Sequence, residues 1–121
     1  MNLIKNQKQK NKMKNPKTFG VWGNIEKDAF WNVLPKIINW AKDKNLELFL
    51  TEKIISDVRS KEFDQPVINS KEKISEMDFM LVLGGDGTFL SCARAVENRS
   101  TPILGIHLGD LGFLAKVTLE N

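Results

Sequence analysis

Cysteines, long apolar runs and an N-terminal apolar segment are scarce or absent in this chain of 121 residues. The single cysteine, Cys92, excludes a disulfide within the chain and a metal cluster built from several thiolates. No apolar stretch approaches the roughly 20 residues that a membrane span needs. The sequence also lacks the continuous apolar segment of a secretory signal, so we expect a cytoplasmic location and no membrane partner.

Acidic residues are absent from the first 17 positions, which hold six lysines. The other residues carry 12 basic and 15 acidic side chains, so their net charge is −3, whereas the whole chain is at +3. Residues 1–17 contain little that could be buried, which predicts a disordered basic tail. Such a run is more often a solvated extension than a nucleic-acid site, and we expect no specific nucleic-acid partner.

Residues 18–119 have the ordinary composition of one soluble domain, and strand and helix patterns alternate along them. The strongest helix signal is the helical spacing of apolar residues at positions 30, 33, 34, 37, 38 and 41. Pro35 lies within this pattern and predicts either a kink or a helix start shortly before it. Short apolar runs at residues 18–22, 46–50, 79–83 and 103–106 predict four strands.

This alternation is typical of an α/β fold, a Rossmann-like parallel sheet with flanking helices. Residues 51–76 are polar and weakly patterned. A short helix at residues 54–61 and a second one before Asp78 are the only elements that we expect there.

The most informative stretch is residues 79–90, where a buried strand is followed by glycines and then by a helix. Gly84, Gly85 and Gly87 allow a sharp turn and let bare N–H groups approach a ligand. The first turn of the following helix adds unpaired N–H donors at its positive end. In open α/β sheets ligands bind at such positions, so the pattern indicates a phosphate site.

Asp86 lies among these glycines, where its charge would repel a phosphate. Three roles for it remain open. The carboxylate could hold a metal ion that accompanies the phosphates, or act as a general base on the hydroxyl that attacks phosphorus. It could also simply cap the helix.

A second glycine-rich segment, residues 105–114, directly follows the last strand and suggests another backbone that closely approaches something. The sequence of residues 84–88, Gly-Gly-Asp-Gly-Thr, resembles the motif of the NAD kinases, which lipid kinases and phosphofructokinases share in related form. The second segment, Gly-Ile-His-Leu-Gly-Asp-Leu-Gly-Phe-Leu, resembles the one that follows it in NAD kinases alone. The pair of motifs makes the resemblance to NAD kinases specific.

The resemblance implies an enzyme that phosphorylates the 2′-hydroxyl of the adenosine ribose of NAD with ATP to give NADP. Asp86 is then the proton acceptor, Gly87 lies against the ribose, and Phe113 borders the adenosine. Gly84, Gly85 and Thr88 shape the phosphate-facing turn. His107 has a structural role or lies behind the ligand-binding residues, and no residue is assigned to a metal.

The same resemblance implies a divalent metal ion, Mg²⁺, to offset the charge of the phosphates. It also implies a second, β-rich domain that this sequence does not contain. We therefore expect residues 18–119 to be the N-terminal domain of a two-domain kinase, with small-molecule nucleotides as partners and a homo-oligomer in the full-length protein. A lipid kinase domain of the diacylglycerol or sphingosine type and a non-catalytic nucleotide-binding module are the alternatives. A P-loop enzyme is excluded, since the P-loop sequence is absent.

Overall fold

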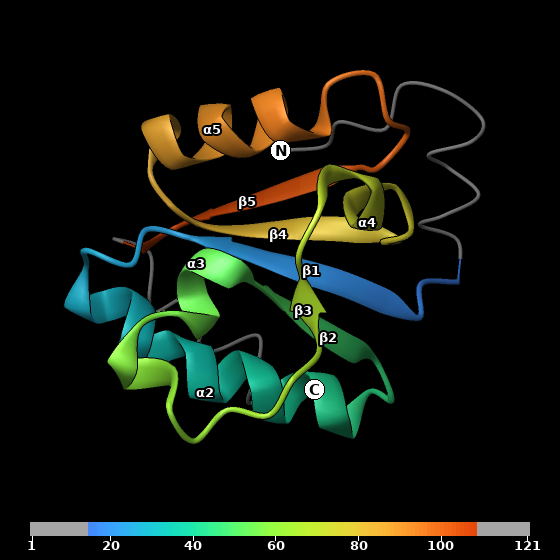
Figure 1. The fold of residues 1–121 in the computed structure, drawn as a ribbon. Helices are drawn as coiled ribbons and strands as arrows, with labels where there is room; N and C mark the ends of the chain where they lie inside the picture. The colour runs from blue at the N-terminus through green and yellow to red at the C-terminus, as the bar shows by residue number, and fades with distance from the viewer. Residues whose placement is uncertain (1–14, 109–121) are drawn as a thin grey trace.

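A five-stranded parallel sheet forms the centre of the molecule in the computed structural model, which describes residues 15–108 (Figure 1). The strand order is β3-β2-β1-β4-β5. The strands are β1 (Thr18–Gly23), β2 (Glu47–Thr51), β3 (Val67–Ile68), β4 (Phe79–Gly84) and β5 (Ile103–His107). The predicted α/β class and parallel sheet are confirmed.

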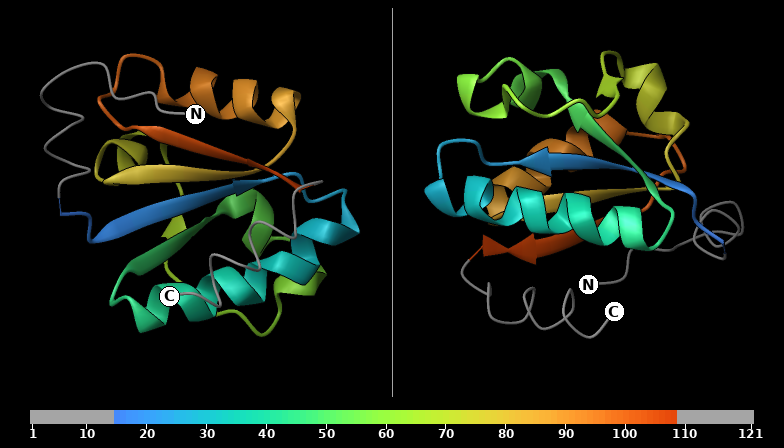
Figure 2. Two further views of the ribbon diagram at one scale, coloured as in Figure 1. Left: turned by 180° about the vertical axis from the view of Figure 1, so that it is seen from behind. Right: turned by 90° about the horizontal axis from the view of Figure 1, so that it is seen from below.

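Helices cover both faces of this sheet. They are α2 (Asp28–Asp43), α3 (Glu52–Ile55), the 3₁₀ helix η1 (Val58–Ser60), α4 (Lys71–Ser75) and α5 (Asp86–Val96). Helix α2 packs on one face, and α4 and α5 pack on the other, as the view from below shows (Figure 2). Alternate residues of β1 and β4 therefore enter two separate apolar cores, which is the pleat of a strand buried on both sides.

Helix α2 buries the six apolar residues whose spacing predicted it: Phe30, Val33, Leu34, Ile37, Ile38 and Ala41. The helix begins at Asp28 and continues through Pro35, whose ring lies on the exposed face. The expected helix start close to the proline is therefore wrong. None of the helices in the described part of the chain is long and apolar enough to cross a membrane.

The expectation for residues 51–76 needs two corrections. The predicted helix at residues 54–61 is divided into α3 and η1. The second correction is strand β3, which the sequence analysis missed. Its two residues pair with Leu50 and Thr51, and the N–H of Leu50 donates to Pro66 O at 2.9 Å. A two-residue strand is too short to show alternation, so its pairing depends on tertiary contacts.

The side chain of Arg59, in η1, contacts the loop that follows β1. Its guanidinium lies 4.6 Å from the centre of the Trp31 ring and donates from Nη2 to Ile25 O at 3.0 Å. The same nitrogen pairs with Asp57 Oδ2 at 2.9 Å. Hydrogen bonds from the Arg59 side chain and backbone N–H lower the pKa of Asp57 from 3.8 to about 2.

This pair predicts a specific acid sensitivity. A carboxylate whose pKa is lowered by folding stabilises the fold above its unfolded pKa of about 3.9. That contribution is lost as the pH falls through about 2. Between pH 5 and pH 2 we therefore expect the urea midpoint of the native chain to fall further than that of Asp57→Asn. Equal falls in the two proteins would contradict a role for the pair in stability.

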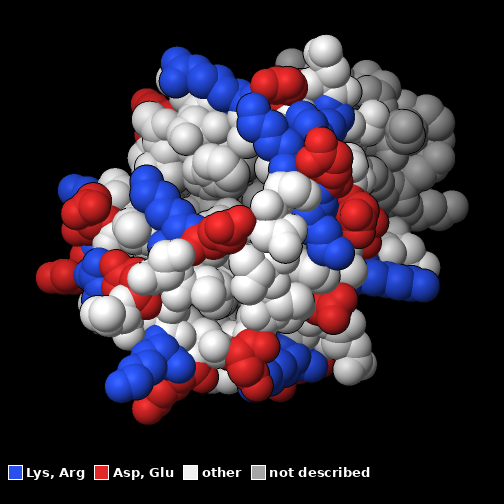
Figure 3. All heavy atoms as spheres, in the orientation of Figure 1, with Lys and Arg blue, Asp and Glu red and all other residues white. Residues whose placement is uncertain are grey.

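On the face seen in Figure 3, acidic and basic side chains are interspersed rather than gathered by sign. This face therefore carries no extended patch of one charge, and electrostatic attraction there is local to individual sites.

Candidate functional site

The carboxyl ends of β1 and β4 lie side by side at the centre of the sheet, with Gly23 paired to Leu83. The chain leaves β1 through α2 toward one face and leaves β4 through α5 toward the other. This is the topological switch point, where open α/β sheets bind their ligands. The residues 84–88 predicted as the phosphate-facing turn lie at this edge.

The surroundings of the glycines in this turn differ from one position to the next. Gly84 ends β4, and a Cβ there would lie 2.6 Å from Thr88 Oγ1, so Thr88 packs directly over it. A Cβ at Gly85 or Gly87 would meet nothing within 4 Å. No glycine among residues 15–108 has a positive φ, so none of the glycines of this turn is required for a left-handed backbone conformation. Open space above Gly85 and Gly87 is what a close ligand would require.

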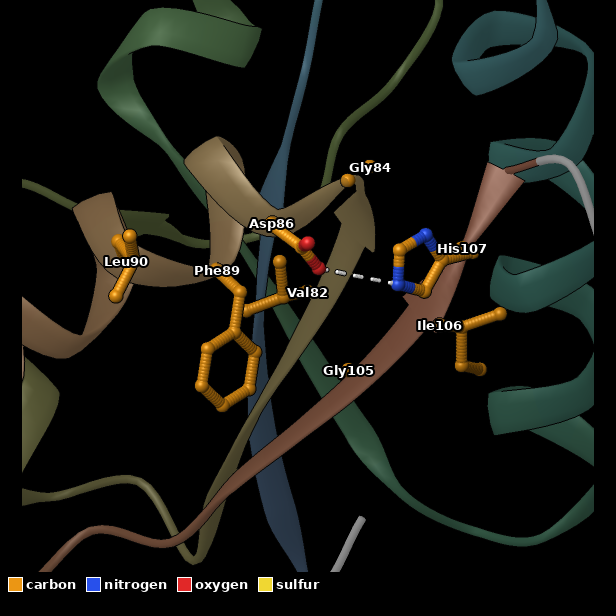
Figure 4. A pocket seen from close by; sticks show the side chains of 9 residues that line it. Val82, Gly84, Asp86, Phe89, Leu90, Gly105, Ile106 and His107 are labelled. Carbon is orange, nitrogen blue, oxygen red and sulfur yellow. Dashed lines mark ion pairs between the residues drawn. The ribbon is translucent and has the colours of Figure 1, made fainter.

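Asp86 is the first residue of α5, and its side chain is 92% exposed. No side chain caps this helix, since Gly85 occupies the N-cap position. The capping role considered for Asp86 is therefore wrong. Its Oδ1 instead lies 3.4 Å from Nε2 of His107, the last residue of β5 (Figure 4). The register that pairs Gly84 with His107 brings the imidazole to the carboxylate.

A cavity of about 590 Å³ opens beside this pair, between α5 and β5. Asp86 and His107 lie next to each other along it, and apolar side chains supply most of the other surface (Figure 4). The apolar lining is Val82, Phe89, Leu90 and Ile106. An apolar cavity with a few convergent polar groups is the usual form of a small-molecule site.

Sequence reasoning missed this apolar lining. Phe89 and Leu90 show helical spacing, which predicts burial, yet Leu90 is 54% exposed. The backbone at Gly105 was expected to approach something closely. It approaches the Phe89 ring, because a Cβ at Gly105 would lie 2.8 Å from Phe89 Cδ2. For Phe89 and Leu90 the sequence contains one signal of a place in the lining. Both follow the glycine turn, in a helix that begins at the edge of the sheet where ligands bind.

The predicted site residues are only partly brought together. Gly84, Gly85 and Asp86 line the cavity, together with His107, which had been given a structural role. Gly87 and Thr88 lie in the first turn of α5 but do not line the cavity. Phe113 lies outside the described residues, as do the predicted tail up to residue 14 and the glycine segment from residue 109.

Asp78, at the opposite end of β4, has a structural role. Its Oδ2 accepts hydrogen bonds from the backbone N–H groups of Lys17 and Thr18, at 2.7 and 3.0 Å. These bonds fix the beginning of β1 beside β4. The described residues contain no group of three or more histidine, cysteine or acidic side chains that could hold a metal ion.

Cys92 is a packing residue of α5 with no exposed surface, and burial raises the pKa of its thiol to about 12. The reactive form of a cysteine is the thiolate, so we expect no labelling by a maleimide in the native protein at pH 8. In denaturant the same thiol should react fully. Rapid labelling of the native protein would contradict the packing around α5.

A comparison with protein families decides where this fold belongs. The model of the ATP-NAD kinase N-terminal domain matches residues 7–121. The chain belongs to the NAD kinase family. It is 37% identical over 103 residues to the NAD kinase of Syntrophotalea carbinolica, covering 84% of this chain and 35% of that protein.

Two further NAD kinases show the same extent of similarity. The one from Caldanaerobacter subterraneus is 37% identical over 101 residues, with 84% of this chain and 35% of the relative covered. A Clostridium botulinum NAD kinase is 38% identical over 105 residues, with 87% and 34% covered. The chain thus spans about a third of the length of these relatives.

Proposed function

We propose that the protein is an NAD kinase, which transfers a phosphoryl group from ATP to the 2′-hydroxyl of the adenosine ribose of NAD and so gives NADP. Its family supports the reaction. The observation that carries the proposal is the placement of Asp86, an exposed carboxylate beside a largely apolar cavity at the switch point of the sheet. An apolar cavity suits a nucleoside, and the adjacent carboxylate suits its hydroxyl.

In this proposal Asp86 acts as the general base. One carboxylate oxygen accepts the proton of the 2′-hydroxyl while the hydroxyl oxygen bonds to the terminal phosphorus of ATP, and ADP leaves with the electrons of the broken P–O bond. Asp86 is almost fully exposed and makes no capping hydrogen bond, so its oxygens are available for this proton. General base action of this kind contributes roughly 10² to 10⁴ in rate.

His107 holds the carboxylate in position. Its Nε2 lies 3.4 Å from Oδ1 of Asp86, which leaves Oδ2 for the ribose hydroxyl. The imidazole comes from β5 and the carboxylate from α5, so the contact also joins the two elements that border the cavity. Gly87 against the ribose and Phe113 beside the adenosine belong to the same proposal.

A Mg²⁺ ion would supply the positive charge that offsets the donor phosphates. Mg²⁺ usually binds through one or two carboxylates together with substrate phosphates, and it does not need a full cage of protein ligands. The described residues fit this mode. They contain no cluster of metal ligands, but they present Asp86 at the edge where phosphates would lie.

The test is product formation by the full-length product of the gene. With NAD, ATP and Mg²⁺ we expect NADP, detected by an NADP-specific dehydrogenase, and no phosphate transfer to diacylglycerol or sphingosine. Phosphorylated lipid without NADP would establish the lipid kinase alternative. Nucleotide binding without transfer to either acceptor would favour the non-catalytic module.

A further inference from the structure

The first turn of α5 contacts β5 at two points. Asp86 and Phe89 are three positions apart, so they lie on the same side of the helix. Gly105 and His107 are two positions apart, so they lie on the same face of the strand. The carboxylate of Asp86 contacts the imidazole of His107, and the ring of Phe89 lies against Gly105. All four residues line the cavity (Figure 4).

The contact between Phe89 and Gly105 leaves no space for a side chain on the strand. A Cβ at Gly105 would lie 2.8 Å from Cδ2 and 3.2 Å from Cε2 of the ring, and real Cβ atoms essentially never come within 3.0 Å of such an atom. The ring also packs against the buried apolar cluster that contains Val82, Cys92 and Val96. A side chain at position 105 would therefore push the ring away from β5 and against a close-packed core.

The backbone of Phe89 links this contact to Asp86. The N–H of Phe89 donates to Gly85 O at 3.0 Å, which closes the first turn of α5 around Asp86. A displacement of Phe89 therefore moves the turn that carries the carboxylate. The pairing of β5 with β4 keeps Gly105 and His107 in place beside that turn.

We propose that Phe89 and Gly105 are positioning residues that act through Asp86. The ring, seated on Gly105, holds the first turn of α5 against β5 and so keeps the carboxylate at His107. This inference rests on the proposed function, in which the same carboxylate accepts the proton of the ribose hydroxyl. Neither Phe89 nor Gly105 needs to touch the reacting atoms, because a misplacement of about 1 Å at a catalytic group can lower a rate by about 10².

The test is a double-mutant cycle in the full-length protein with Gly105→Ala, Phe89→Leu and the two combined. Each single change should lower kcat for NADP formation at least about tenfold and alter the KM for NAD less, because the base is displaced while the cavity remains. The double variant should lose less than the product of the two single losses, because the smaller leucine can turn away from the added methyl group. Losses that simply multiply would show that the two residues do not act together.

Crystal structures of the native protein and the Gly105→Ala variant test the geometry without any assay. In the variant the Phe89 ring should lie farther from β5, and Asp86 Oδ1 should lie more than 3.4 Å from His107 Nε2. An Asp86 carboxylate that stays at His107 would overturn the positioning role. If Gly105→Ala does not fold, the structure of Phe89→Leu answers the same question, because it removes the ring without adding a methyl group.

Gly20→Ala is the matched control for overpacking. Gly20 lies in β1 and does not line the cavity, yet a Cβ there would lie 2.7 Å from Met80 Sδ. This variant should unfold at a lower temperature than the native protein and keep the native kcat. An equal loss of kcat in Gly20→Ala and Gly105→Ala would make the effect a general one of destabilisation. A native protein that forms no NADP rejects the proposed function alone, and the crystal structures still decide whether the Phe89 contact holds Asp86 at His107.

Discussion

Replacement of Asp86 by Asn is expected to lower the rate of NADP formation by about 10² to 10⁴, the usual contribution of a general base. The amide cannot accept the proton of the ribose hydroxyl at neutral pH. The side chain is 92% exposed and does not cap α5, so stability should change by no more than about 0.5 kcal/mol. Steady-state kinetics and thermal unfolding of the full-length protein measure the two effects.

Glu62→Gln is the matched control, because Glu62 is an exposed carboxylate in the loop after η1 and far along the chain from the glycine turn. It should keep the native rate. If Asp86→Asn retained the native rate, Asp86 would not be the proton acceptor. If it lost activity only together with the fold, its role would be structural.

Alanine substitutions at two glycines of the same turn, Gly87 and Gly84, are expected to have different effects on stability and activity. In Gly87→Ala the new methyl meets no protein atom within 4 Å, and alanine favours the helix by up to about 1 kcal/mol. We therefore expect equal or higher stability. Activity should nevertheless fall at least about tenfold, because the methyl occupies the space that the ribose would approach and displaces its hydroxyl from Asp86.

Gly84→Ala should instead lower the stability of the protein. The added Cβ would lie 2.6 Å from Thr88 Oγ1, and such overpacking typically costs about 1 to 3 kcal/mol. Thermal unfolding and NADP assays on both variants distinguish the two roles. Full activity in Gly87→Ala would mean that no ligand approaches this residue. A loss of stability there would mean that the space above it is filled in solution.

Much of the fold could be predicted because its signals are local. The strands β1 and β4 are short apolar runs, and the buried residues of α2 follow from their spacing alone. The strand–glycine–helix order also predicted that the glycine turn follows β4 at the carboxyl edge of the sheet. Strand β3 could not be predicted in this way, since two residues carry no periodicity.

The composition of the site depended on contacts between distant segments. The partner of Asp86 is His107, 21 positions away, and only the register between β4 and β5 brings them together. The sequence also did not show why glycine stands at each of these positions. Gly105 makes room for Phe89 and Gly84 for Thr88, whereas Gly87 makes room for no protein atom. A glycine in a sequence does not reveal which of these applies.

In the proposed reaction the carboxylate of Asp86 meets the 2′-hydroxyl of the adenosine ribose of NAD. A crystal structure of the full-length protein with NAD bound tests it most directly. We predict that the ribose lies beside the cavity between α5 and β5, with its 2′-oxygen about 2.6 to 3.2 Å from an Asp86 oxygen. NAD bound with that ribose away from Asp86, or with another hydroxyl at the carboxylate, would contradict the account.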